Sequence, residues 1–285
     1  MNLSPSPLEA APAKTVIEIA PSPAWRAVDF KEIWRYRELL WIFVQRDIKV
    51  RYRQTVLGGL WALVQPLTSM VMFTLLFHRI AKLDAGVAVP YSVFVLCGLL
   101  PWNFFSAGVQ NAGNSLIGNA HLISKVYFPR LIVPLASVLV GFADFGVALL
   151  LLVALMVWMG VIPGIGLALL PFVMLLTFFL ALGIALWLAA LNVEYRDIRV
   201  VIPFLIQIGF FGTPIAYPLH SLPPTLRSLA LWNPMTAIVE TFRAGVVGGP
   251  VPWEMLGRSI LVSIVLLISG TLYFRRMERQ FADVL

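Results

Sequence analysis

Six long apolar stretches constrain this chain more than any other feature of its sequence. A helix needs about 20 apolar residues, at 1.5 Å each, to cross a bilayer. Only 12% of the residues are charged, against about 25% in a soluble domain, so charge cannot cover a water-facing surface. We therefore expect an all-α membrane protein with six transmembrane helices. They are expected at residues 56–77, 91–109, 131–158, 165–191, 200–219 and 259–274.

The distribution of lysine and arginine predicts how these helices are oriented. With six spans both termini lie on one side, and sixteen of the 21 basic residues fall on that side. Because basic connections stay in the cytoplasm, both termini are expected there. The basic residues lie in connections at one end of the apolar stretches, and this placement argues against nucleic-acid binding.

The first 54 residues precede the spans. Residues 1–30 are rich in proline and alanine and lack an apolar core, so we expect a disordered leader and not a signal peptide. Residues 31–54 place apolar side chains on one helical face and charged ones on the other. This pattern predicts an interfacial amphipathic helix, with a helix packed on a partner protein as the alternative. Residues 55–285 then form the transmembrane domain.

The predicted interfacial helix ends in a charged cluster. Its apolar face would carry Ile33, Tyr36, Leu40, Phe43 and Val44. The cluster consists of Arg46, Asp47, Lys49, Arg51 and Arg53. Asp47 and Arg51 are spaced i, i+4, so they are expected to pair.

Residues 220–249 form an interrupted segment between the fifth and sixth spans. Pro223, Pro224 and Pro234 break it, which favours two short re-entrant or surface helices on the outer side. Within it we single out Trp232, Pro234, Glu240 and Arg243. Glu240 and Arg243 are spaced i, i+3 and are expected to pair with each other or across a dimer.

Several kinds of chemistry have no signature here. The sequence contains no phosphate-binding G-x-x-x-x-G-K-[ST] loop and no G-x-S-x-G motif, its three histidines are far apart, and Cys97 is its single cysteine. We expect no catalytic residue and no metal site. Asp144 is the one clear ionisable candidate within a span. Without a cationic partner in the spans it cannot form a proton relay, and helix packing, subunit contact and a functional role remain open.

Four segments carry a resemblance to a known family. They are RDIKVRYRQTVLGGLWALVQP from Arg46, NAHLISKVYFPRLIVP from Asn119, VEYRDIR from Val193 and WNPMTAIVETFR from Trp232. In their order and placement they resemble the permease subunits of ATP-binding-cassette polysaccharide exporters, which export O-antigen, capsule or teichoic-acid chains. The resemblance covers about residues 31–285.

The resemblance implies a set of partners and a location. It implies a homodimer in the bacterial inner membrane that works with two copies of a cytoplasmic ATPase. That ATPase would bind ATP and Mg²⁺, so this chain itself needs no cofactor. The substrate would be a lipid-linked polysaccharide, with O-antigen favoured, moving through a channel at the dimer interface among membrane lipids. An exporter of small hydrophobic molecules and a membrane-integral glycosyl- or acyltransferase are the alternatives.

Two groups of side chains are expected to function in transport, one lining the channel and one contacting the ATPase. A sugar channel needs aromatic platforms and small polar groups, and the first and fifth spans offer such faces, although each residue could equally contact lipid or neighbouring helices. The predicted channel lining is Trp61, Gln65, Thr68, Ser69, Met72, Phe204, Gln207, Phe211 and Tyr217. The resemblance also implies an ATPase-coupling surface, for which we select Lys125, Tyr127, Phe128, Arg130, Glu194, Arg196 and Asp197.

Overall fold

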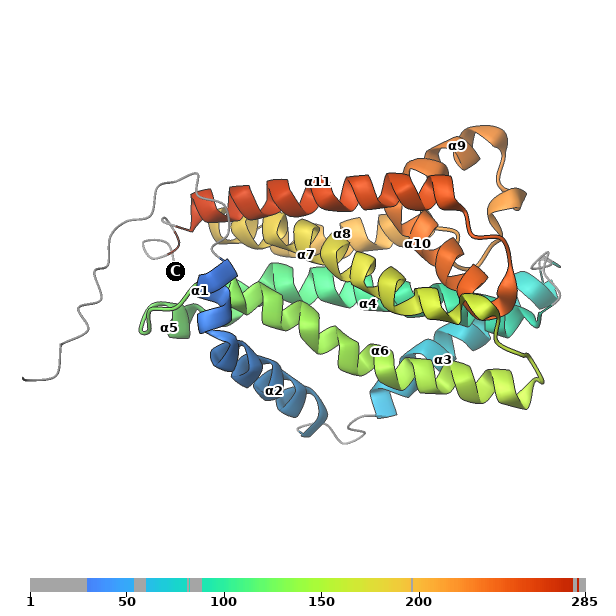
Figure 1. Cartoon of the computed structure of the whole chain (residues 1–285), viewed down its shortest axis with the longest axis horizontal. Coiled ribbons are helices and arrows are strands. Elements are labelled where there is room, and N and C mark those ends of the chain that lie inside the picture. The colour runs from blue at the N-terminus through green and yellow to red at the C-terminus, as the bar shows by residue number, and fades with distance from the viewer. Residues whose placement is uncertain are drawn as a thin grey trace, which may run out of the picture.

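The computed structural model describes residues 30–53, 60–80, 82, 89–195, 197–278 and 281. Every regular element within those residues is helical. Residues 1–29, residues 54–59, which include the start of the predicted first span, and Arg196 lie outside the described residues. The long helices run roughly side by side (Figure 1). At one end, here called the α5 end, they carry α5 (Ala120–Ile123), and at the opposite α9 end they carry α9 (Pro224–Trp232).

Five helices are long and apolar enough to cross a membrane. Three of the predicted spans are extended, because the neighbouring polar residues continue the helix beyond the apolar stretch. The five are α3 (Trp61–Phe73) with a π-helical segment (Thr74–Ile80), α4 (Tyr91–Gly118), α6 (Ile132–Trp158), α7 (Leu170–Glu194) preceded by a 3₁₀ turn (Ile165–Leu169), and α11 (Trp253–Met277).

The stretch expected to form the fifth span is a shorter helix. Residues 200–219 were expected to be helical, but α8 (Ile198–Phe211) ends eight residues earlier. Thr213 precedes Pro214, whose ring disfavours the helical conformation in the residue before it, and Gly212 weakens the helix at the same point. At 1.5 Å per residue, the 14 residues of α8 span about 21 Å, less than the apolar thickness of a bilayer.

The N-terminal helix is divided into α1 (Phe30–Arg35) and α2 (Arg37–Arg53). Its predicted apolar face is the side that packs on the protein, because Phe43 and Val44 are buried and α2 lies along α6. Trp34 and Trp41 remain exposed at the edges of that face.

The interrupted outer segment contains two short helices, α9 and α10 (Pro234–Arg243), followed by a π-helical turn (Ala244–Gly248). Asn233 separates the two helices and caps the second, since its side-chain oxygen accepts a hydrogen bond of 2.9 Å from the backbone N–H of Met235. Pro234 fits the first turn of α10 because that position needs no N–H donor.

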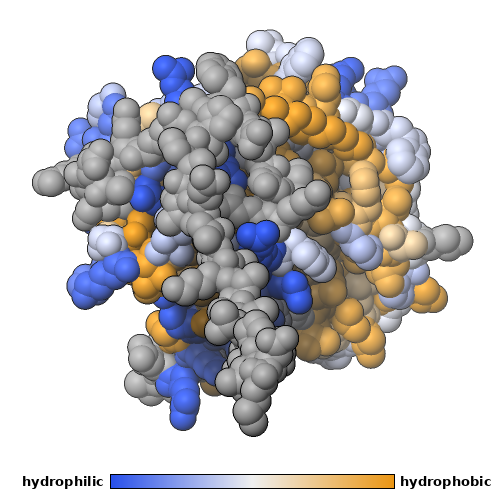
Figure 2. Space-filling view, turned by 60° about the vertical axis from the view of Figure 1, so that its left-hand side comes forward, coloured by the Kyte–Doolittle hydropathy of each residue, from blue (hydrophilic) through white to orange (hydrophobic). Residues whose placement is uncertain are grey.

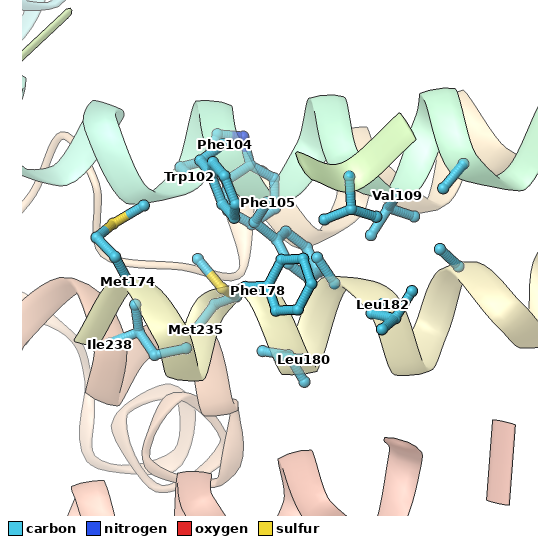
Figure 3. Packing of buried hydrophobic residues seen from close by; sticks show 14 of the residues in the cluster. Trp102, Phe104, Phe105, Val109, Met174, Phe178, Leu180, Leu182, Met235 and Ile238 are labelled. Atoms are coloured by element: carbon cyan, nitrogen blue, oxygen red, sulfur yellow. The ribbon is translucent and has the colours of Figure 1, made fainter. Parts of the chain in front are cut away.

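The core forms around α4, which packs against α6 and α7 along most of their lengths, while α11 covers α7 from the other side. Apolar residues of α4, α7 and α10 pack together between the helices, among them Trp102 and Phe105 of α4 and Phe178 of α7 (Figure 3). Glycines allow the closest approach. A Cβ on Gly270 of α11 would lie 2.3 Å from the carbonyl oxygen of Gly183 on α7, so the two backbones touch.

Candidate functional site

Two helices beside the core expose most of their apolar side chains. In α3 the residues Trp61, Val71 and Met72 are exposed, and α8 buries one residue, Ile202. The ring of Phe73 on α3 stacks on Phe210 of α8 with centroids 5.6 Å apart. The two helices meet at this pair of rings, and their exposed surfaces are together called the α3/α8 face.

The α3/α8 face is fastened to α4 by aromatic packing. Trp102 of α4 meets Phe210 edge-on with ring centroids 5.7 Å apart. Gly209 provides the room, because a Cβ there would lie 3.0 Å from Cη2 of Trp102.

The predicted channel residues are distributed over this face. Trp61, Gln65, Thr68 and Met72 are exposed on α3 and Ser69 is half-buried; Phe204, Gln207 and Phe211 are exposed on α8. Tyr217 is half-buried beyond the end of α8, where its hydroxyl donates a hydrogen bond of 2.6 Å to the carbonyl oxygen of Phe211. The arrangement offers aromatic and amide groups on an open surface, not an enclosed tube within one chain.

A cavity of about 440 Å³ lies beside α3, between α2, α4 and α6. Trp61 and Gln65 line it, together with a polar stripe of α4 that includes Asn103, Ser106 and Gln110. The α8 residues of the predicted channel do not line it. The stripe was missed in the sequence, although polar residues spaced three and four apart in an apolar helix share one face and could have indicated it.

The charged residues at this cavity correct one prediction and give Asp144 a partner from outside the spans. Asp47 does not pair with Arg51; its carboxylate lies 2.8 Å from Arg46, the preceding residue. Arg51 instead forms an ion pair with Asp144. The inward side of α2 packs on α6, so Arg51 reaches the carboxylate across the two helices. Asp144 thus does have a cationic partner, supplied by α2 and not by a span.

Tyr52 completes this cluster by donating a hydrogen bond to the Asp144 carboxylate. Burial raises the pKa of the Tyr52 phenol, and the hydrogen bond to Asp144 raises it further. The phenol therefore keeps its proton and remains a donor. Arg51 and Tyr52 together neutralise and bind the single carboxylate on α6.

Apart from Arg196, which lies outside the described residues, the predicted coupling residues lie at the α5 end, in and beside the connections from α4 to α6 and from α7 to α8 (Figure 1). Lys125, Tyr127, Glu194 and Asp197 are exposed there. Figure 2, with this end turned forward, shows hydrophilic residues gathered around it beside a hydrophobic flank.

Two residues of the α4–α6 connection hold it to the rest of the chain. Phe128 is buried and packs on Phe43 of α2 with centroids 5.7 Å apart. The backbone N–H of Arg130 donates a 3.1 Å hydrogen bond to the Glu278 carboxylate beyond α11. Phe128 and Arg130 therefore anchor the connection, whereas Lys125 and Tyr127 are free to meet a partner.

At the α9 end a buried arginine joins three segments. The Nη1 group of Arg243 donates a 2.8 Å hydrogen bond to Glu240, so the predicted pair forms within one chain. Arg243 also donates to the backbone carbonyls of Phe94 and Ile215. Its guanidinium lies 3.7 Å from the Phe94 ring centroid. Trp232 is exposed, with Arg258 over its ring at 5.6 Å.

Among the described residues, no three His, Cys, Asp or Glu side chains come together in a way that could hold a metal ion. The polar cavity, the α3/α8 face and the exposed connections at the α5 end are three features that a ligand or a partner could reach. A further cavity of about 300 Å³ lies at the α9 end, beside Glu240 and Arg243.

The sequence was compared with those of known proteins. The profile of the ABC-2 type transporter family matches residues 38–247. The O-antigen export system permease protein RfbA of Myxococcus xanthus is 32% identical over 257 residues, covering 89% of this chain and 97% of that protein. The Klebsiella pneumoniae permease of the same name is 28% identical, covering 87% and 95%. The polysialic acid transport protein KpsM of Escherichia coli is 27% identical, covering 82% and 91%.

Proposed function

This chain belongs to the ABC-2 type transporter family, and from that premise we propose that it is the membrane permease of an ATP-driven polysaccharide exporter. The substrate is a lipid-linked polysaccharide, with O-antigen favoured, and the membrane is the bacterial inner membrane. The observation that carries the proposal is the likeness to O-antigen export permeases along almost the whole of both chains.

The proposed topology has six crossings. Five are the long apolar helices, and α8 together with the irregular segment that follows it makes the sixth. Both termini and the α5 end then lie in the cytoplasm, in keeping with the excess of basic residues in those connections. The helices α1 and α2 lie at the cytoplasmic interface, where exposed tryptophans such as Trp34 and Trp41 are favoured. The helices α9 and α10 form the re-entrant pair on the outer side.

Two copies of the chain form the path for the polymer. A single copy leaves the α3/α8 face open and apolar, and exposed amides such as Gln65 and Gln207 are costly against lipid. A second copy facing the first would enclose these groups. Aromatic side chains such as Trp61 and Phe204 then supply platforms for the apolar faces of sugar rings.

Energy comes from a partner, because the sequence has no G-x-x-x-x-G-K-[ST] loop for ATP. Two copies of a nucleotide-binding ATPase, which hold ATP and Mg²⁺, dock on the α5 end. Lys125 and Tyr127 are exposed at that end on a connection that Phe128 and Arg130 hold in place. Movement of the ATPase is therefore passed to α2 and α11.

Deletion of the gene in the producing bacterium tests the function. The expected result is loss of surface polysaccharide and accumulation of the lipid-linked chain inside the cell, and the wild-type gene should reverse both effects.

A variant gene with Gln207→Leu should restore export poorly in the deletion strain. Val153→Leu, at an exposed position of α6 away from the path, serves as the matched control. Unchanged surface polysaccharide after deletion would exclude the proposed function.

Charge reversal tests the coupling surface. Lys125→Glu should abolish the stimulation of the ATPase by the permease in reconstituted vesicles, because it inverts the charge at the docking connection. Arg227→Glu on α9 makes the same change at the other end and should leave stimulation intact. ATPase activity that still responds to transport in the Lys125→Glu protein would rule out this surface.

A further inference from the structure

We propose that the cavity between α2, α3, α4 and α6 is a binding subsite for an uncharged sugar unit of the exported chain, adjoining the α3/α8 face and sharing Trp61 and Gln65 with it. The inference rests on the proposed function and adds to it a site within each copy of the permease. The cavity volume of about 440 Å³ falls within the range of small-ligand pockets.

The cavity wall is rich in amides that have no partner. Gln65 on α3 and Asn103, Gln110 and Asn111 on α4 line it. In the part of the chain that the structure describes, none of these four side-chain amides forms a hydrogen bond. An amide in a membrane-spanning helix is costly unless something satisfies it. Four such groups around one hollow indicate a ligand with several hydroxyl groups.

The charges of the cavity favour a neutral ligand. Its charged lining residues are Arg51 and Asp144, and these form an ion pair with each other. Tyr52 directs its hydroxyl to the same carboxylate. No cation in this lining is left to hold a phosphate group, and no carboxylate is left to hold a cation. Amides that both donate and accept hydrogen bonds suit sugar hydroxyls, which do the same.

The cavity also contains the aromatic surface that a sugar ring needs. Trp61 lines it with a side chain that is 54% exposed, and Phe145 of α6 lines it as well. A sugar ring has apolar C–H faces and polar edges, so it can stack on the indole while its hydroxyls reach the amides. The amides, the hydroxyls and the aromatic rings around this cavity therefore all suit a sugar as the ligand.

The position of the cavity connects the subsite with both the polymer path and the coupling surface. Trp61 and Gln65 belong both to this cavity and to the proposed polymer path, whereas Phe204, Gln207 and Phe211 belong to the path alone. Arg51 and Tyr52 of α2 also line the cavity. Because α2 also contacts the α4–α6 connection through Phe43, a sugar in the cavity touches the helix that adjoins the coupling surface.

Protection from thiol labelling tests the subsite. Cys97 is the single cysteine and is fully buried, so the wild-type chain gives a low background. Gln110→Cys and Asn111→Cys place a reactive thiol in the cavity wall. Gln207→Cys, exposed on α8, is the matched control on the path. The probe is a set of short oligosaccharides released by mild acid from the producing strain's own surface polysaccharide, added to the full-length permease–ATPase complex in nanodiscs.

The labelling rate of Gln110→Cys and Asn111→Cys should fall about tenfold at an oligosaccharide concentration about ten times its Kd, since only the unoccupied fraction reacts. The fall at Gln207→Cys should be smaller. Protection at Gln207→Cys alone overturns the cavity subsite and leaves the proposed function standing. Absence of protection at all three positions also overturns it, while export in cells tests the function separately. Protection by inorganic pyrophosphate but not by the oligosaccharides would overturn the assignment to a neutral ligand.

Discussion

The helices α3 and α4 are both apolar enough to cross a membrane, but their surroundings are opposite. In the most apolar part of α4, 83% of the residues are buried within the chain, against 11% for α3 with its π-helical continuation. Small residues account for much of the difference. Gly108 and Gly113 let neighbouring helices approach α4, since a Cβ on Gly113 would lie 2.9 Å from Ile202. The helix α3 has no glycine.

An apolar composition shows that a helix lies in the membrane, but it does not show whether lipid or protein surrounds that helix. Residues of the same chain cover most of the apolar surface of α4, whereas lipid or a second copy must cover that of α3. Substitutions among the buried contacts of α4 are therefore expected to lower the stability of the chain. Substitutions on the exposed surface of α3 are expected to impair transport. Four changes test that division.

The largest effect is expected where α10 is tied to α4. Arg243→Met removes the partner of Glu240 and the donor to the Phe94 carbonyl, which should lower the free energy of unfolding by about 3–5 kcal/mol. The control is Arg258→Met, whose partner Glu254 is exposed and 3.8 Å away, with an expected cost of about 0–1 kcal/mol. Unfolding in SDS titrations, followed by tryptophan fluorescence, measures both. Equal losses would contradict the role of the buried pair.

Truncating leucine on each helix tests the comparison directly. Leu99 of α4 is 2% exposed, and Leu76 in the continuation of α3 is 51% exposed. Leu99→Ala should cost about 2–5 kcal/mol because it leaves a cavity. Leu76→Ala should cost within about 0.5 kcal/mol. The same SDS titration applies, and a larger loss at Leu76 would mean that α3 is held by the single chain.

Adding one methyl group tests the close packing of α4. In Gly98→Ala the new Cβ would lie 2.7 Å from Nη2 of Arg243 and 3.0 Å from the carbonyl oxygen of Ile215. Such overpacking should cost about 1–3 kcal/mol. Gly118→Ala at the end of α4 meets nothing within 4 Å and should be neutral or slightly stabilising. A thermal-melt series of the two variants separates these outcomes, and stabilisation by Gly98→Ala would refute the packing.

The smallest effect is expected where α3 contacts the body of the protein. Phe73→Leu removes the stacking on Phe210 and should cost about 0.5–1.5 kcal/mol. Phe77→Leu is the control, because the Phe77 ring lies 6.0 Å from the Phe73 ring of the same helical run. If the two variants unfold alike, the stacking does not join α3 to α8.

Much of the fold could be predicted because bilayer crossing demands long apolar helices. The stretch at residues 131–158 is α6 almost to the residue, and Pro223 and Pro234 do mark two short helices. The fifth stretch was overestimated, since apolarity continues past Phe211 where Gly212 and Pro214 end the helix. The predicted pairing of Asp47 with Arg51 was wrong. Arg51 pairs with Asp144, which lies 93 residues further along the chain and which local spacing cannot reveal.

The lipid surroundings of the helices, the family and the lack of a G-x-x-x-x-G-K-[ST] loop could all be read from the sequence, because they depend on composition and on the order of residues along the chain. Only the tertiary structure decided that Asp144 is paired, that Phe128 is an anchor, and that the amides of α3 and α4 surround one hollow. The physical reason is that a hydrogen bond or an ion pair depends on distances of a few ångströms between helices. Periodicity places a side chain on a face of its own helix, but packing alone determines what that face meets.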